Sequence, residues 1–306
     1  MFKSIYKILI KREEPAFMVL RENKEQPEVK VALARLSLNQ AESILRDLSA
    51  TPLSDLSELR SVENPEGLSQ KSLYDLLLQR SKGENLSLDS RGYLGYLTHG
   101  EAYNVLGRLE LEMLEPMNFI RMLEVLKKGI DKEIKIEDEH GKYINPKLLK
   151  KSYDDIFVSN PNELKPLLDP DIFGTVAKAE KNPYRAEWLN SRSVIRHGLI
   201  AGGLHRIIRK KLNKGNSLFE IEEPLDEDTL MEKYRYIIIN DLSKYTTKQG
   251  YPRKDIPFGS LQYYSPLTND FAMVFLSNIK GNELDCNYNP ILFGGGLGVR
   301  AQVCKK

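Results

Sequence analysis

Cysteine, histidine and tryptophan are scarce in this chain. Its 306 residues include two cysteines, four histidines and one tryptophan. The two cysteines, Cys286 and Cys304, are too few for a disulfide scaffold, and neither they nor the histidines have metal-ligand spacing. No GxSxG motif or similar pattern nominates a catalytic nucleophile. The sequence therefore predicts a protein that is not an enzyme and that holds no metal or cofactor.

Long apolar runs and an excess of one charge are also missing. No stretch approaches the roughly 18 consecutive apolar residues of a transmembrane helix. The first residues, "MFKSIYKILIKREEP", lack the apolar region and cleavage site of a signal peptide. The net charge is only +2, which gives no global attraction to nucleic acid. We therefore expect no membrane span and no secretion signal, and a cytoplasmic location in a cellular host.

Helical patterns occupy the middle of the chain and β-prone patterns its end. We expect helices over 98–114, 115–128 and 145–157, with Thr98 capping the first, Pro116 in the first turn of the second and Gly129 just past its end. Beyond residue 183 the sequence changes to short pieces such as "YRYIIIN", "SLQYY", "FAMVFLS", "NELDC" and "LGVRAQV". The predicted fold class is α+β, with an α-rich N-terminal part followed by a β-rich C-terminal part.

This change of pattern divides the chain into three predicted segments. Residues 1–115 form an N-terminal α+β region of unknown role, and residues 116–182 form a helical segment with a proline-rich connector. Residues 183–306 form the β-rich domain. Its only tryptophan, Trp188, is expected to anchor the packing, and Cys286 is expected to be a small core residue.

A basic stretch, "RSVIRHGLIAGGLHRIIRKKLNK", covers residues 192–214. Such a stretch favours an alternative function, a nucleic-acid-associated protein. The cations that would contact phosphates are Arg192, Arg196, Arg206, Arg209, Lys210 and Lys211. The apolar residues within 204–212 have helical spacing, which predicts a helix whose charged face is solvated. The acidic run that follows, "EIEEPLDEDT", is interpreted as solvated surface.

A glycine-rich stretch, "FGGGLGVRAQVCKK", ends the chain. A phosphate-binding loop needs a helix after its glycines, to supply backbone amides and a dipole. Only eight residues follow Gly298, and "VRAQVCKK" alternates as a strand does. We therefore interpret the glycines as a flexible turn that leads into a terminal strand.

Five motifs of the last 120 or so residues occur in a recognisable order. They are "NPYRAEWLN", "LMEKYRYIIINDLSKYTTKQGYP", "FGSLQYYSP", "FAMVFLSNIKGNELDCNYNP" and "LGVRAQV". In this order the chain resembles a group of archaeal and viral proteins with a C-terminal C-type-lectin-like domain, over residues 140–306. Some of those proteins are the variable proteins of diversity-generating retroelements. Departures from the group are Tyr264, where it has tryptophan, Asn190, where it has aspartate, and the basic "IAGGLHRII".

The resemblance implies a non-enzymatic ligand-binding protein with a C-type-lectin-like fold. A surface at about 276–296 would be displayed to a protein or glycan ligand, and a retroelement would diversify it. In a virus the protein would be a receptor-binding or virion protein, and oligomers are compatible with this role. The fold is also related to formylglycine-generating enzymes, whose chemistry needs a copper-binding cysteine pair. Cys304 lies in the terminal tail, so formylglycine-generating activity, the third candidate function, is disfavoured.

The period-two pattern from Phe275 to Pro290 agrees with a strand pair that packs one face and displays the other. We expect Tyr288 and Phe293 to contact the ligand while contributing little to stability. The full set of expected ligand-binding residues is Leu276, Asn278, Lys280, Glu283, Asp285, Asn287, Tyr288, Asn289, Ile291, Leu292 and Phe293.

Overall fold

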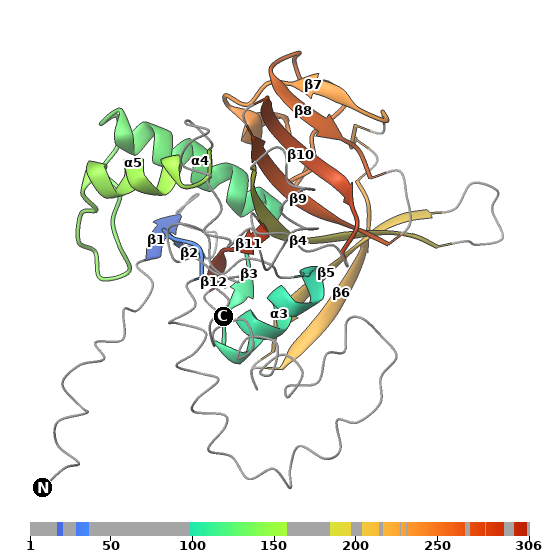
Figure 1. Ribbon diagram of the computed structural model, residues 1–306, viewed down its shortest axis with the longest axis horizontal. Coiled ribbons are helices and arrows are strands. Elements are labelled where there is room, and N and C mark those ends of the chain that lie inside the picture. The colour runs from blue at the N-terminus through green and yellow to red at the C-terminus, as the bar shows by residue number, and fades with distance from the viewer. Residues whose placement is uncertain are drawn as a thin grey trace, which may run out of the picture.

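Over the residues that the structure describes, the fold combines two β-sheets with three α-helices (Figure 1). The computed structural model describes residues 17–20, 29–36, 98–157, 184–196, 204–213, 217–226, 228–230, 232–266, 270–278, 280–290 and 297–304. Across these ranges the α+β class predicted from the sequence is confirmed. None of the helices in them is both long and apolar enough to cross a membrane.

The helices begin where capping signals predict them, but the first predicted helix (98–114) ends at Arg108, and Glu112–Met113 at its expected end form a strand. They are α3 (His99–Arg108), α4 (Pro116–Ile130) and α5 (Pro146–Asp154). At the start of α3 the Thr98 hydroxyl accepts a hydrogen bond from the backbone N–H of Glu101, and the Glu101 carboxylate accepts one from the Thr98 N–H.

Gly129 lies inside α4, so the expected end of that helix at Gly129 is wrong. A Cβ atom at this position would lie 2.4 Å from Cδ1 of Ile136. The glycine therefore lets the chain after the helix pack closely against it, instead of ending the helix.

The large sheet contains the β-rich part of the chain. Its strand order is β6-β5-β4-β9-β10-β8-β7, and β11 pairs with β4 outside this path. Most neighbours are antiparallel, but β10 runs parallel to β8 and β11 parallel to β4. The bounds are β4 (Tyr184–Arg196), β5 (Leu204–Leu212), β6 (Leu218–Pro224), β7 (Arg235–Ile237), β8 (Leu261–Tyr264), β9 (Phe271–Asn278), β10 (Gly281–Tyr288) and β11 (Leu297–Val299). A short 3₁₀ helix, η3 (Leu242–Tyr245), precedes β8.

The helix predicted over 204–212 is a strand, β5. It pairs antiparallel with β4 on one side and β6 on the other. Ile207 and Ile208 are both buried, and β-branched residues pack well on a pleated surface. Pairing with two neighbouring strands therefore decides the conformation, against the helical spacing of the apolar residues.

A small second sheet joins segments that are far apart in the sequence. It has the order β1-β2-β12-β3, with β1 (Phe17–Leu20), β2 (Val29–Ala32), β3 (Glu112–Met113) and β12 (Ala301–Cys304). The terminal "LGVRAQV" is therefore split at Arg300 between two sheets. The sheet combines residues from the first and last predicted segments.

Helices cover both faces of the central strand β9. On one face, Met273 and Phe275 share a core with Phe119 and other residues of α4. On the other face, Val274 and Leu276 share a core with residues of α3. In Figure 1, α4 and α3 lie to either side of the inner strands, whereas β7, β8 and β10 extend beyond α3. The predicted boundaries at 115/116 and 182/183 therefore do not separate the two cores.

Candidate ligand-binding surface

Two of the motifs that carry the resemblance meet at a buried charge cluster. The Glu187 carboxylate of "RAEWL" accepts hydrogen bonds from Arg300 of "LGVRA", at 3.1 Å from Nε and 2.8 Å from Nη2, and from Nε of Arg35 at 3.1 Å. Arg300 also donates to the backbone carbonyls of Ala32 and Leu33, the first of them at 3.1 Å. All three charged side chains are almost fully buried.

This cluster is structural. Although burial alone would raise the pKa of Glu187, the two guanidinium groups lower it to about 2. The carboxylate is therefore ionised at neutral pH and has its hydrogen-bonding capacity used by the arginines. It joins β4, the residue that follows β11 and the segment after β2.

The residues predicted to bind a ligand fall into three groups. Leu276 is buried in the core beneath α3, so its predicted display is wrong: both faces of β9 are covered. Residues 291–293 (Ile291, Leu292 and Phe293) lie outside the described residues. The others lie on or beside β10 and are exposed or half-buried: Asn278, Lys280, Glu283, Asp285, Asn287, Tyr288 and Asn289.

Tyr288 is part of the packing. Its ring contacts the buried ring of Trp188 edge-on, with centroids 5.5 Å apart, and it packs against the core shared with α3. Trp188 and Cys286 are both buried, which confirms their predicted packing roles. Burial raises the pKa of the Cys286 thiol, so this cysteine is not an activated nucleophile.

Three tyrosines and two carboxylates gather on the outer strands of the large sheet. Pairing places Tyr236 opposite Gln262, Gln262 beside Glu283, and Tyr264 beside Asp285. Tyr234 contacts both other tyrosines, with ring centroids 5.9 Å from Tyr264 and 6.4 Å from Tyr236. We call this the tyrosine–carboxylate face; it consists of Tyr234, Tyr236, Gln262, Tyr264, Glu283 and Asp285.

The tyrosine–carboxylate face continues the sheet surface that α3 covers further along. Glu283 pairs with Leu276, and Asp285 pairs with Val274, both of which lie in the core beneath α3. Tyr234 and Tyr236 are 53% and 42% exposed. The same sheet surface is thus buried beneath α3 at β4 and β9. At β7, β8 and β10 its side chains are half-buried or exposed.

Hydrogen bonds hold the strands of this face together. The Asn287 amide donates to the carbonyl of Ser265 at the end of β8, and the Ser265 hydroxyl donates to the carbonyl of Glu232 just before Tyr234. Gln262 donates to the hydroxyl of Tyr264. The rings are therefore supported by neighbouring strands, which lowers the ordering cost of binding.

The two carboxylates of this face stand in an unusual electrostatic setting. Burial, followed by the charge of Glu283, raises the pKa of Asp285 to about 6, although a hydrogen bond from the backbone N–H of Asn287 at 2.7 Å opposes the shift. Burial and both carboxylates raise the pKa of Tyr264. Within the part of the chain that the structure describes, neither Glu283 nor Asp285 has an ion-pair partner.

The six cations of the basic stretch lie instead in ion pairs. Their partners are mainly acids of β6, the run interpreted from the sequence as solvated surface, together with Glu115 and Asp270. The pairs are Arg192–Asp270 at 3.3 Å, Arg196–Glu222 at 2.6 Å, Arg206–Glu222 at 2.6 Å, Arg209–Glu115 at 3.1 Å, Arg209–Glu223, Lys210–Glu220 at 3.5 Å and Lys211–Glu115 at 3.0 Å. These acids neutralise the surface that the nucleic-acid alternative requires.

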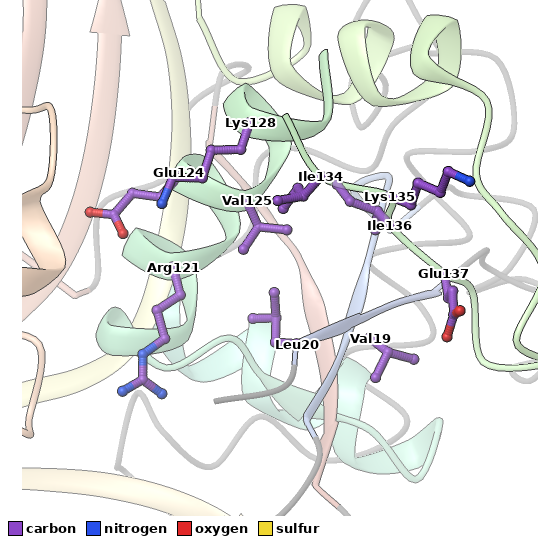
Figure 2. A pocket seen from close by; sticks show the side chains of 10 residues that line it. All are labelled: Val19, Leu20, Arg121, Glu124, Val125, Lys128, Ile134, Lys135, Ile136 and Glu137. Atoms are coloured by element: carbon purple, nitrogen blue, oxygen red, sulfur yellow. The ribbon is translucent and has the colours of Figure 1, made fainter. Parts of the chain in front are cut away.

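A separate cleft of about 380 Å³ lies between α4, β1 and the segment 134–137 (Figure 2). Its middle is aliphatic, with Leu20, Val125 and Ile134. The charged ends of Glu124 and Lys128 point to one side of it and those of Lys135 and Glu137 to the other. The guanidinium of Arg121 also points away from the aliphatic middle, whereas specific sites need polar groups that converge on the ligand.

No metal site is visible in the described ranges, which contain no group of three or more His, Cys, Asp and Glu side chains that would hold an ion. His99 lies inside the core, where its Nε2 is 3.0 Å from the carbonyl of Leu189 and burial lowers its pKa to about 4. Comparison with known proteins gives no match to a family model, to a curated protein or to a solved structure.

Sequence reasoning found Glu283 and Asp285 but missed Tyr234, Tyr236, Gln262 and Tyr264. A signal for them exists in the sequence: tyrosines alternate in "YRY", and "LQYY" ends in two more. Alternation places Tyr234 and Tyr236 on one face of a strand. Only the fold shows that β8 pairs with β10 and that β7 pairs with β8.

Proposed function

We propose that this protein is a non-enzymatic binding protein that presents its tyrosine–carboxylate face to a protein or glycan ligand. The observation that carries the proposal is the contact of Tyr234 with Tyr236 and Tyr264 beside two half-buried carboxylates, Glu283 and Asp285. Large, rigid aromatic rings with polar neighbours supply contact area and orientation at small entropic cost. Such recognition needs no catalytic group.

We further propose that the large sheet belongs to a C-type-lectin-like fold. The motif order along the chain supports this, and so does the placement of "RAEW" beside "LGV", more than 100 residues later. Ala186, Glu187 and Trp188 pair in parallel register with Leu297, Gly298 and Val299. Motifs that adjoin in space are expected when the resemblance reflects a common framework.

Diversification of residues 276–296 by a retroelement is part of the same proposal, as is a receptor-binding role on a virion if the host is a virus. Sequencing of the neighbouring DNA tests both. A reverse-transcriptase gene and a template repeat that matches the codons for this region are expected. Without them, the protein would be a fixed binder.

Binding itself is tested with the full chain on an array of neutral and acidic glycans and on an array of host surface proteins. The variant Tyr234→Ala/Tyr264→Ala should lose the signals that the wild type gives. Tyr143→Ala is the matched control, because Tyr143 is 58% exposed and lies away from this face. Equal signals from the double variant and the wild type would contradict the proposal.

A further inference from the structure

We propose that the group held by the tyrosine–carboxylate face is a cation, namely the lysine or arginine side chain of a protein ligand. This deepens the proposed function and rests on it. Glu283 and Asp285 project from one face of β10, and no cation among the described residues pairs with either. A ligand cation would neutralise both carboxylates through charge-assisted hydrogen bonds.

The nearest cation of β7 does not compete for this position. Arg235 pairs with Tyr263, whose side chain is buried on the opposite face of the sheet. The guanidinium carbon of Arg235 lies 5.7 Å from the ring centroid of Phe258. Its Nη1 lies 3.6 Å from the carboxylate of Glu232. The only described contact of the Glu283 carboxylate is with the amide of Asn278, at 3.3 Å.

The aromatic rings favour the same class of ligand. A cation over a tyrosine ring is attracted by the negative π-face, more strongly where water is partly excluded. The molecule uses this interaction elsewhere, because Nζ of Lys210 lies 5.1 Å from the ring centroid of Tyr103. On the tyrosine–carboxylate face the rings of Tyr234, Tyr236 and Tyr264 are present, and the cation is not supplied by any described part of the chain.

Acids elsewhere on the sheet illustrate the contrast. Glu222 and Glu223 of β6 each lie against at least one arginine of the chain. Glu283 and Asp285 are half-buried on one face of β10, and no cation of the described residues pairs with either carboxylate. Like charges at close range destabilise a protein unless a counter-charge arrives, which here comes from the ligand.

The test uses the full chain and two immobilised peptides that differ only in charge. Both are Gly/Ser peptides; one carries a central Arg-Lys-Arg and the other a central Gln-Gln-Gln. We expect the cationic peptide to bind at concentrations below about 1 mM and the neutral one not to bind. The variant Glu283→Gln/Asp285→Asn should lower affinity for the cationic peptide roughly tenfold or more. Tyr234→Ala/Tyr264→Ala should lower it severalfold.

A matched control removes the same charges elsewhere. Asp131→Asn/Glu133→Gln takes two exposed carboxylates from the end of α4 and should leave the affinity unchanged. Acidification offers a second readout: between about pH 7 and pH 5, binding should weaken as Asp285 becomes protonated, with Glu283, Tyr264 and Cys286 as its charged or titratable neighbours.

Two outcomes would overturn the inference. One is no binding of the cationic peptide up to about 1 mM. The other is an equal loss of binding in the two charge-removal variants, which would mean non-specific attraction. A third result would contradict the cation inference and leave the proposed function intact. It is binding of neutral glycans that is lost in Tyr234→Ala/Tyr264→Ala and kept in Glu283→Gln/Asp285→Asn.

Discussion

Glu187 and Asp285 are both carboxylates of the large sheet, but their surroundings shift their pKa values in opposite directions. Glu187 is enclosed by two arginines, and its pKa falls to about 2. Asp285 is partly buried beside Glu283 and has no described cationic partner, so its pKa rises to about 6. The charge of Glu187 is paired within the fold, whereas the charge of Asp285 has no cationic partner among the described residues.

This comparison explains why the two regions have different roles in our interpretation. A buried carboxylate that is fully paired holds segments together, and removal of one partner leaves uncompensated charge. A half-buried carboxylate without a partner lowers stability at neutral pH, and such groups are commonly retained at binding sites.

The largest effect is expected from Glu187→Gln. Arg35 and Arg300 would remain buried without their counter-charge, so we expect a loss of about 3–5 kcal/mol of unfolding free energy. Urea denaturation at neutral pH measures it. Glu222→Gln, which breaks surface pairs with Arg196 and Arg206, should cost less than about 1 kcal/mol. Similar losses in the two variants would refute the structural role of the buried cluster.

Tyr288→Ala should have an intermediate effect. The sequence predicted a ligand-contacting residue that contributes little to stability, whereas its ring packs on Trp188. Removal of a half-buried aromatic ring is expected to cost about 2 kcal/mol. Thermal or urea unfolding checks this against Tyr143→Ala, for which we expect a change within about 0.5 kcal/mol. An unchanged unfolding midpoint in Tyr288→Ala would restore the interpretation from the sequence.

Asp285→Asn should stabilise the protein at neutral pH. A folded-state pKa raised to about 6 from the ordinary 3.8 favours folding while the group is protonated, below the ordinary value. That contribution is lost as the pH rises through about 6, so the asparagine variant should gain about 1 kcal/mol near pH 7 and nothing near pH 3.5. Urea unfolding at the two pH values distinguishes them, and a gain that is independent of pH would contradict the assignment.

The ionisation of Glu187 should change the free energy of unfolding in the opposite direction as the pH falls, as measured by urea unfolding. Its folded-state pKa of about 2, below the ordinary 4.5, gives stability that is present above the ordinary value. That stability is lost as the pH falls from about 4.5 towards 2. The wild type should therefore lose stability in this range, and the loss should be smaller in Glu187→Gln. A parallel acid profile in both proteins would argue against the pairing.

The smallest effect is expected for nucleic-acid binding. Because the six cations of the basic stretch have acidic partners, the full chain should elute from heparin at low salt, with a weak dependence on salt. Charge reversal at Arg206, Arg209 and Lys211 should change elution little. Strong, steeply salt-dependent retention that these changes abolish would favour the nucleic-acid alternative instead.

The sequence by itself determined the features that depend on neighbouring residues. Thr98 and Glu101 start α3, Pro116 starts α4, and the β-prone pieces after residue 183 form strands, because caps and alternation act over a few residues. The burial of Trp188 and Cys286 also follows from residue type.

Only the tertiary structure decided which surfaces are covered. Residues 204–212 form a strand that pairs with two neighbours, although their apolar spacing is helical. Strand β9 is packed on both faces. The last motif divides between the two sheets. The acids of β6 neutralise the basic strand, whereas the carboxylates of β10 meet tyrosines from β7 and β8 and the segment before them. Strand order brings these groups together across long separations in sequence, which a one-dimensional pattern of spacing does not encode.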